Sequence, residues 1–68
     1  MLNSKLIKQR MAQMGLTQKN LAEMLNLASP TVNQKIYNSR PLTLQEAEKI
    51  AKILKIEDNL FGEYFFGG

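Results

Sequence analysis

Residues 17–37 read Thr-Gln-Lys-Asn-Leu-Ala-Glu-Met-Leu-Asn-Leu-Ala-Ser-Pro-Thr-Val-Asn-Gln-Lys-Ile-Tyr, and this stretch decides the fold. Thr17 is a good N-cap residue and predicts the start of a first helix. The apolar positions that follow at helical spacing are Leu21, Ala22 and Leu25. Asn26 is predicted to end this helix, because asparagine tolerates the left-handed backbone conformation better than most residues.

A second helix is predicted to begin within the same stretch. Ser29 before Pro30 predicts a capping hydroxyl followed by a proline at the first helical position, where its missing N–H costs nothing. Val32 and Ile36, four residues apart, predict the inward face. Because the segment between the two helices is too short for a side-by-side hairpin, they should meet at a steep angle. This is the geometry of a helix-turn-helix, over about residues 17–37.

Helical spacing continues on both sides of this motif. Upstream of the motif, an apolar stripe over residues 6–14 predicts an additional helix that ends at Gly15. Downstream, Thr43 and Glu46 match a capping box and predict a supporting helix over about residues 43–55. No stretch alternates like a strand.

The end of the chain gives a weaker signal. Asp58 predicts the cap of a last short turn, and Gly62 argues against a long helix there. The predicted fold is therefore all-α, a compact bundle of about five short helices. At 68 residues, the chain can bury only roughly 60% of its unfolded surface, so residues 1–68 are expected to form one domain with an aromatic tail over 58–68.

The composition excludes much chemistry. The chain has no Cys, His or Trp, so it lacks the thiolate and imidazole groups that serve most often as nucleophiles, bases and metal ligands. Glu46 and Glu48 cannot face each other on a helix. We therefore expect no enzyme activity, no metal and no cofactor. The absence of a long apolar segment predicts no membrane span and a cytoplasmic protein.

Charge is divided unevenly along the chain. Residues 1–40 carry six Lys or Arg against one acidic residue, a net charge of +5, and residues 41–68 carry three against five, a net charge of −2. A basic half on a small domain is typical of a polyanion-binding protein. The alternative is a charged surface that maintains solubility.

The sequence resembles the Cro/CI-type helix-turn-helix regulators of bacteria and their phages, a family with the lambda-repressor-like DNA-binding fold. The matching residues run from Leu16 to Leu25, continue with Ser29-Pro30-Thr31-Val32 and Ile36-Tyr37-Asn38, and extend through Leu44 to Leu54. The chain departs from the family pattern at Asn26, where glycine is usual, and at Lys35, where an apolar residue is common. Asn26 suits the same backbone, and the Lys35 stem can lie along the core edge.

The resemblance implies that the second helix of the motif enters the major groove of double-stranded DNA. With Val32 and Ile36 facing inward, Gln34 points outward and is the first candidate for a base contact, most naturally with adenine. Asn33 and Ser29 come next. Pro30 and the Thr31 methyl group are candidates for contact with a thymine methyl.

Other residues are expected to position the helix on the DNA backbone. By resemblance, Gln18 contacts a phosphate at the start of its helix. The resemblance also assigns phosphate contacts to the residues that follow the reading helix, which are Asn38, Ser39 and Arg40. Lys19 and Lys35 are further candidates. Lys5, Lys8 and Arg10 are expected to supply background charge only.

The aromatic tail raises the question of assembly. Phe61, Tyr64, Phe65 and Phe66 follow the supporting helix closely, and an exposed apolar cluster predicts an interface. A homodimer through this tail would suit an operator with two half-sites. The alternative is that the tail folds back and completes the core.

Two functions follow from these features. The first is a Cro-like repressor that binds an operator in a bacterial cell or phage-infected host, as part of a genetic switch. The second is a protein-binding module, either an anti-repressor that captures a partner repressor or an antitoxin.

Overall fold

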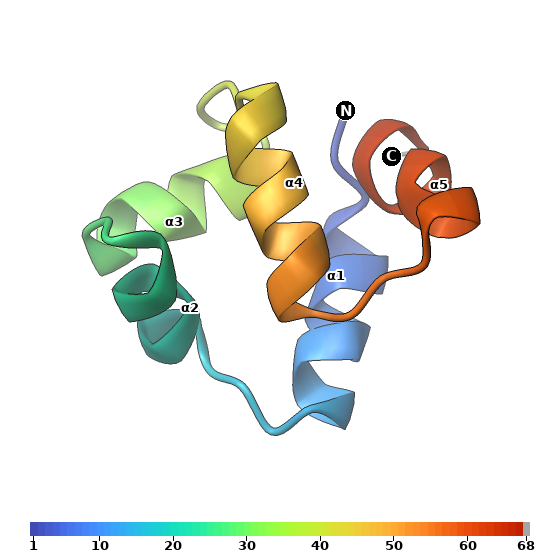
Figure 1. The fold of residues 1–68 in the computed structure, drawn as a ribbon. Coiled ribbons are helices and arrows are strands. Elements are labelled where there is room, and N and C mark those ends of the chain that lie inside the picture. Colours follow the sequence, from blue (N-terminus) through green and yellow to red (C-terminus); the bar gives the residue numbers. More distant parts are fainter. Residues whose placement is uncertain (68) are drawn as a thin grey trace.

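The computed structural model describes residues 1–67, and all the regular secondary structure among those residues is helical. Figure 1 shows α4 crossing in front of α1, with α2 and α3 on one side and α5 on the other. The elements are α1 (Ser4–Gln13), α2 (Gln18–Leu25), α3 (Ser29–Ile36), α4 (Leu44–Ile53), the 3-10 turn η1 (Asp58–Leu60) and α5 (Phe61–Phe66). The predicted all-α bundle of about five short helices is confirmed.

One hydrophobic core joins these helices. The largest fully buried side chains come from the first four helices and the residue after α4, and they are Ile7, Leu21, Val32, Ile36, Ile50 and Leu54. Each of them lies on the face that helical spacing predicts as inward. The core therefore fixes the rotation of every helix, including α3, about its own axis.

The first four helices end in the same way. Each is followed by a residue with a left-handed backbone: Gly15 (φ 68°), Asn26 (φ 58°), Asn38 (φ 62°) and Lys55 (φ 53°). The next N–H then donates to a carbonyl of the last helical turn, as in a Schellman motif: Leu16 to Met11 (2.9 Å), Leu27 to Ala22 (2.9 Å), Ser39 to Gln34 (2.7 Å) and Ile56 to Ala51 (2.9 Å). The predicted ends at Gly15 and Asn26 are confirmed.

The aromatic tail folds back onto the core, which is the second of the two arrangements that the sequence left open. Phe65, predicted to lie in an exposed cluster, is only 4% exposed, whereas Phe66 is 66% exposed. Phe61 and Tyr64 are half-buried against the same core. Helix α5 runs through Gly62, and the Asn3 N–H donates to the Tyr64 carbonyl (2.8 Å). Burial of Phe65 and this hydrogen bond stabilise a short helix that glycine alone would disfavour.

Asp58 also has a different place from the predicted one. The residue before η1 is Glu57, and no side chain caps this turn. Asp58 is therefore the first residue of the 3-10 turn and not its cap. No helix in the described part of the chain is both long enough and apolar enough to cross a membrane.

Candidate nucleic-acid interface

Helix α3 has one buried face and one exposed polar face. Val32 and Ile36 are each 1% exposed, whereas Asn33 and Gln34 are exposed. Ser29 and Pro30 are exposed at the start of the helix, and Thr31 is half-buried. The outer face therefore presents an amide pair and a hydroxyl, which are groups that hydrogen-bond to base edges.

The N-terminus of α3 has no side-chain cap. Its N-cap residue is Ala28, Ser29 is already inside the helix, and Pro30 occupies the first turn. The prediction that Ser29 caps this helix is therefore wrong. Ala28 has the extended backbone of the N-cap position (φ −71°, ψ 145°), so the helix begins at Ser29, one residue before the predicted start. As a result, no capping bond ties up the Ser29 hydroxyl at the exposed end of the helix.

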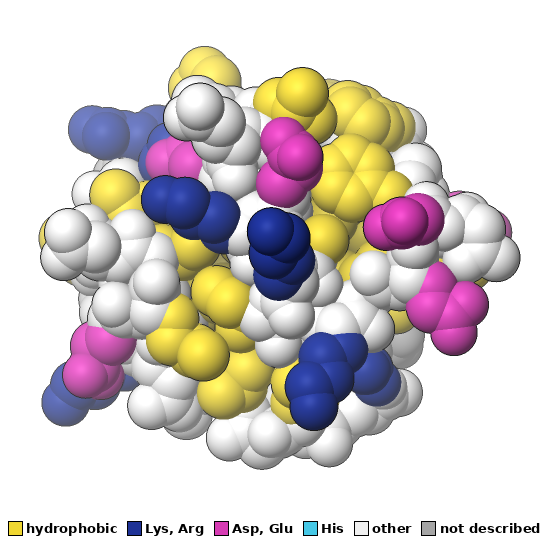
Figure 2. All heavy atoms as spheres, in the orientation of Figure 1, with side chains coloured by type: hydrophobic (Ala, Val, Ile, Leu, Met, Phe, Trp, Pro, Cys, Tyr) yellow, Lys and Arg dark blue, Asp and Glu magenta, His cyan; other side chains and the backbone are white. Residues whose placement is uncertain are grey.

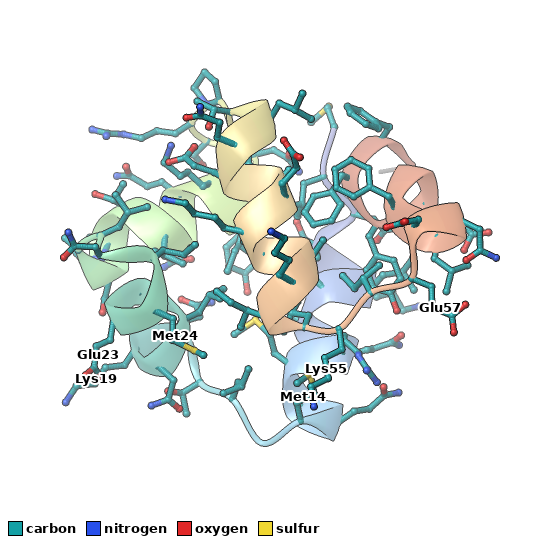
Figure 3. The ribbon with its side chains drawn as sticks, viewed as in Figure 1. Met14, Lys19, Glu23, Met24, Lys55 and Glu57 are labelled. Carbon is teal, nitrogen blue, oxygen red and sulfur yellow. The ribbon has the colours of Figure 1, made fainter. Side chains whose placement is uncertain are left out.

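Helix α2 begins with the predicted cap. The Thr17 side chain accepts from the Asn20 N–H (3.1 Å), and the Asn20 side chain accepts from the Thr17 N–H (3.0 Å), so both halves of a capping box are present. Gln18 lies directly after this cap and is half-buried, while Lys19 is exposed. Figure 3 shows Lys19 and Glu23 projecting together from α2, so the acidic side chain offsets part of the Lys19 charge.

The Lys35 side chain is partly buried and is engaged by α4 and by the loop after α3. Its ammonium lies 2.7 Å from Glu46 Oε1 in α4 and donates to the Pro41 carbonyl (3.2 Å). Only 13% of the Lys35 side chain is exposed, so the stem lies along the core edge as expected. Because this charge already has a partner, we no longer expect Lys35 to contact a phosphate.

The ion pair with Lys35 lowers the pKa of its partner, Glu46. Burial of Glu46 raises its pKa, but the hydrogen bond from Lys35 and the Thr43 N–H (2.9 Å) outweigh burial and hold the pKa below its ordinary value. Glu46 also belongs to the capping box that begins α4. A single carboxylate thus links the start of α4 to the side of α3.

Three neighbouring residues in the loop after α3 were all predicted to contact phosphates, but the structure gives them different surroundings. The Asn38 amide donates to the Leu2 carbonyl (2.9 Å) and accepts from the Leu2 N–H (3.1 Å), so it holds the N-terminal segment and is not free for a phosphate. Ser39 and Arg40 are exposed, and their N–H groups donate to the Gln34 carbonyl at 2.7 and 3.2 Å. Of the three, Ser39 and Arg40 remain the candidate phosphate contacts.

Three side chains that the sequence left outside the site support α3 and α4. The Ser4 hydroxyl donates to the Ile36 carbonyl at the end of α3, and the Arg10 guanidinium donates to the Leu54 carbonyl after α4 (2.8 Å). The Lys8 ammonium lies 5.1 Å from the centre of the Tyr37 ring. All three come from α1, and nothing in the local sequence indicates that α1 reaches these helix ends.

Next to the loop lies an apolar groove of about 430 Å³ between the N-terminal segment, the start of α4 and α5. Met1, Leu44 and Phe66 lie around it with 72%, 62% and 66% of their surface exposed. Figure 2 shows hydrophobic side chains gathered on this part of the surface, where the upper end of α4 meets α5. The remaining lining includes the loop residues Asn38, Ser39, Arg40 and Pro41.

A helix-turn-helix that presents its second helix with a polar outer face defines a DNA-binding type of domain. The sequence model of the helix-turn-helix family matches residues 7–61, which is most of the chain. The protein belongs to this family of Cro/CI-type DNA-binding regulators. Searches of curated proteins and of solved structures each gave no significant match.

Proposed function

We propose that this protein is a Cro-like transcriptional repressor that inserts α3 into the major groove of an operator. The observation that carries the proposal is the outer face of α3, where Gln34 is exposed opposite the buried Val32 and Ile36 and Asn33 is exposed beside it. A helix in the major groove reads bases mainly with its N-terminal half. The uncapped N-terminus of α3 leaves that half free.

Individual roles follow from side-chain chemistry. Gln34 is the main base-reading residue, because its amide can pair with both N6 and N7 of adenine. Asn33 and Ser29 supply further hydrogen bonds, while Pro30 and the Thr31 methyl group contact thymine methyls. Phosphate contacts come from residues beside α3 in space or sequence, which are Gln18, Lys19, Ser39 and Arg40.

Selection from a random duplex library tests this function. We expect the protein to enrich a defined sequence and to bind it with a steep dependence on salt concentration. Recovery of random sequences after repeated rounds would contradict sequence-specific reading.

Two matched substitutions test the phosphate assignments. Arg40→Gln should lower the slope of log affinity against log salt by about 0.9, the value for one lost phosphate contact. Lys35→Gln should leave that slope unchanged, because Glu46 already neutralises Lys35. Equal effects of the two substitutions would contradict the distinction between them.

We also propose that a second copy of the chain docks at the apolar groove through Phe66, with Phe61 and Tyr64 supporting it from the half-buried side of α5. The groove shares residues 38–41 with the loop that follows α3, so a copy seated there brings a second reading helix beside the first. Two half-sites about one DNA turn apart require such a pair. Sedimentation equilibrium should show a dimer that Phe66→Ser dissociates. A monomer at all concentrations would contradict this assembly.

The second candidate function, capture of a partner protein, is favoured by the same groove. It predicts that the protein selects no DNA sequence and co-purifies with a larger repressor or a toxin from its native cell. Enrichment of a defined DNA sequence by the purified protein would exclude it as the main function.

A further inference from the structure

A second concave surface lies where the first half of α1 meets the end of α3. It has a volume of about 440 Å³ and is lined by Ser4, Lys5, Lys8, Gln9 and Tyr37. Among the described residues 1–67, no Asp or Glu lines it. Two ammonium groups, one amide and one phenol therefore border the same hollow, and all four can donate hydrogen bonds.

Lys8 has a defined position in this hollow. Its ammonium lies over the Tyr37 ring at 5.1 Å from the ring centre, which is within the range of a cation–π interaction. Tyr37 remains 47% exposed, so the ring restrains the lysine head without removing it from solvent. A cation restrained in this way loses less conformational freedom on binding an anion than a free surface lysine does.

The hollow meets α3 at Tyr37, the C-cap residue of that helix. Tyr37 follows Gln34 by three residues, which places the two on neighbouring positions of the same helix surface. The Ser4 hydroxyl donates to the Ile36 carbonyl, and Asn38 bonds to both backbone groups of Leu2. These bonds attach the basic half of α1 to the end of α3, so Lys5 and Lys8 keep a fixed place relative to the reading helix.

We propose that Lys5, Lys8 and Tyr37 form a phosphate-binding site that holds the DNA backbone beyond the C-terminal end of α3. The inference rests on the proposed DNA-binding function and extends its contact surface to α1. The ligand is a backbone phosphate of the same duplex, because the site lies beside α3 and the described residues that line it offer hydrogen-bond donors and no Asp or Glu. Such a contact adds affinity without sequence preference.

The test compares substitutions of Lys5 and Lys8 with a matched lysine elsewhere. The probe is a labelled duplex of random sequence, about 30 base pairs long, so that two half-sites one turn apart would fit. Lys5→Met with Lys8→Met should lower the salt slope by about 1.8, which corresponds to two lost phosphate contacts. Tyr37→Leu, which keeps all charges, should weaken binding severalfold by releasing Lys8.

Lys55→Met is the control, because it removes the same charge by the same chemistry. Lys55 follows Leu54, whose carbonyl accepts from Arg10 in the C-terminal half of α1, whereas the hollow is lined by the N-terminal half of α1 (Figure 3). The Lys55→Met variant should leave the salt slope unchanged. Because all four substituted positions are exposed, none of the variants should change thermal stability much. If the double variant matches Lys55→Met, the α1 site is overturned while DNA binding stands. If the unsubstituted protein does not bind the duplex, both proposals fail.

Discussion

Helices α3 and α4 have similar buried faces and different N-termini. Both bury isoleucine at 1% exposure, Ile36 in α3 and Ile50 in α4. Helix α4 begins with a complete capping box, whereas α3 begins at Ala28 with no side-chain cap. The contacts that hold α3 are at its inner face and C-terminal end. A helix held in this way can present its first turns to another molecule, while α4 needs only to stay in place.

Substitutions on the buried faces of α3 and α4 should have the largest effect on stability, and the effect should be similar for the two helices. Ile36→Ala and Ile50→Ala should each lower the free energy of unfolding by about 2–4 kcal/mol, because each leaves a cavity in the shared core. Urea denaturation followed by circular dichroism measures this. A loss below about 1 kcal/mol for Ile36→Ala alone would mean that α3 is not packed as described.

Substitutions at the N-termini of α3 and α4 should have different effects on stability. Thr43→Ala removes half of the α4 capping box and should cost about 1 kcal/mol of folding free energy. Ser29→Ala should change stability by less than about 0.5 kcal/mol, since Ser29 caps nothing. The same denaturation experiment measures both variants. Equal losses would restore Ser29 as a cap and contradict the contrast between the helices.

The helix ends offer a stabilising change. Lys55 has a left-handed backbone (φ 53°) after α4, a conformation that costs a residue with a Cβ atom about 1 kcal/mol. Lys55→Gly should therefore raise the melting temperature, with a net gain of about 0.5 kcal/mol after the added freedom of the unfolded chain. Gly15→Ala, at the matching end of α1, should lower it. A fall in melting temperature for Lys55→Gly would show that its side chain contributes more than the backbone costs.

Removal of the Lys35–Glu46 ion pair between α3 and α4 should have the smallest effect on stability, and this effect should depend on pH. Because the pKa of Glu46 is lower in the folded protein than its ordinary value, its ion pair adds stability above the unfolded-state pKa of about 4.3. That stability is lost as the pH falls through the lower, folded-state pKa. Glu46→Gln can keep the capping bonds, since glutamine also forms capping boxes.

We therefore expect the difference in melting temperature between Glu46→Gln and the unsubstituted protein to shrink as the pH is lowered from about 6 to about 3. High salt should shrink it as well. A difference that stays constant across this pH range would mean that the ionised carboxylate contributes nothing beyond its capping bonds.

Local signals in the sequence predicted the helices and most of the core. Capping residues, helical spacing and residues suited to a left-handed backbone gave α1, the motif and α4, because those features act within a few residues. The tail was harder to predict. Phe65 is buried because α5 packs against α1 and the N-terminal segment, and no local pattern specifies that contact.

The candidate site was predicted in part. The outward direction of Gln34 followed from the buried face of the same helix. The tertiary partners of Lys35 and Asn38, which are Glu46 and Leu2, lie on other elements, so spacing along the chain could not predict that these two side chains are already engaged. The position of Lys8 over Tyr37 depends on the same kind of long-range packing.

Base reading by Gln34 can be measured as a preference between two DNA duplexes. The sequence enriched from the random library and a shuffled version of it serve as the two probes, with Gln45→Ala on the exposed side of α4 as the matched control. We predict that Gln34→Ala reduces preference for the enriched sequence by about 10- to 100-fold, or about 1–3 kcal/mol, and changes binding to the shuffled duplex little. Unchanged preference in Gln34→Ala, with Gln45→Ala behaving identically, would contradict the account.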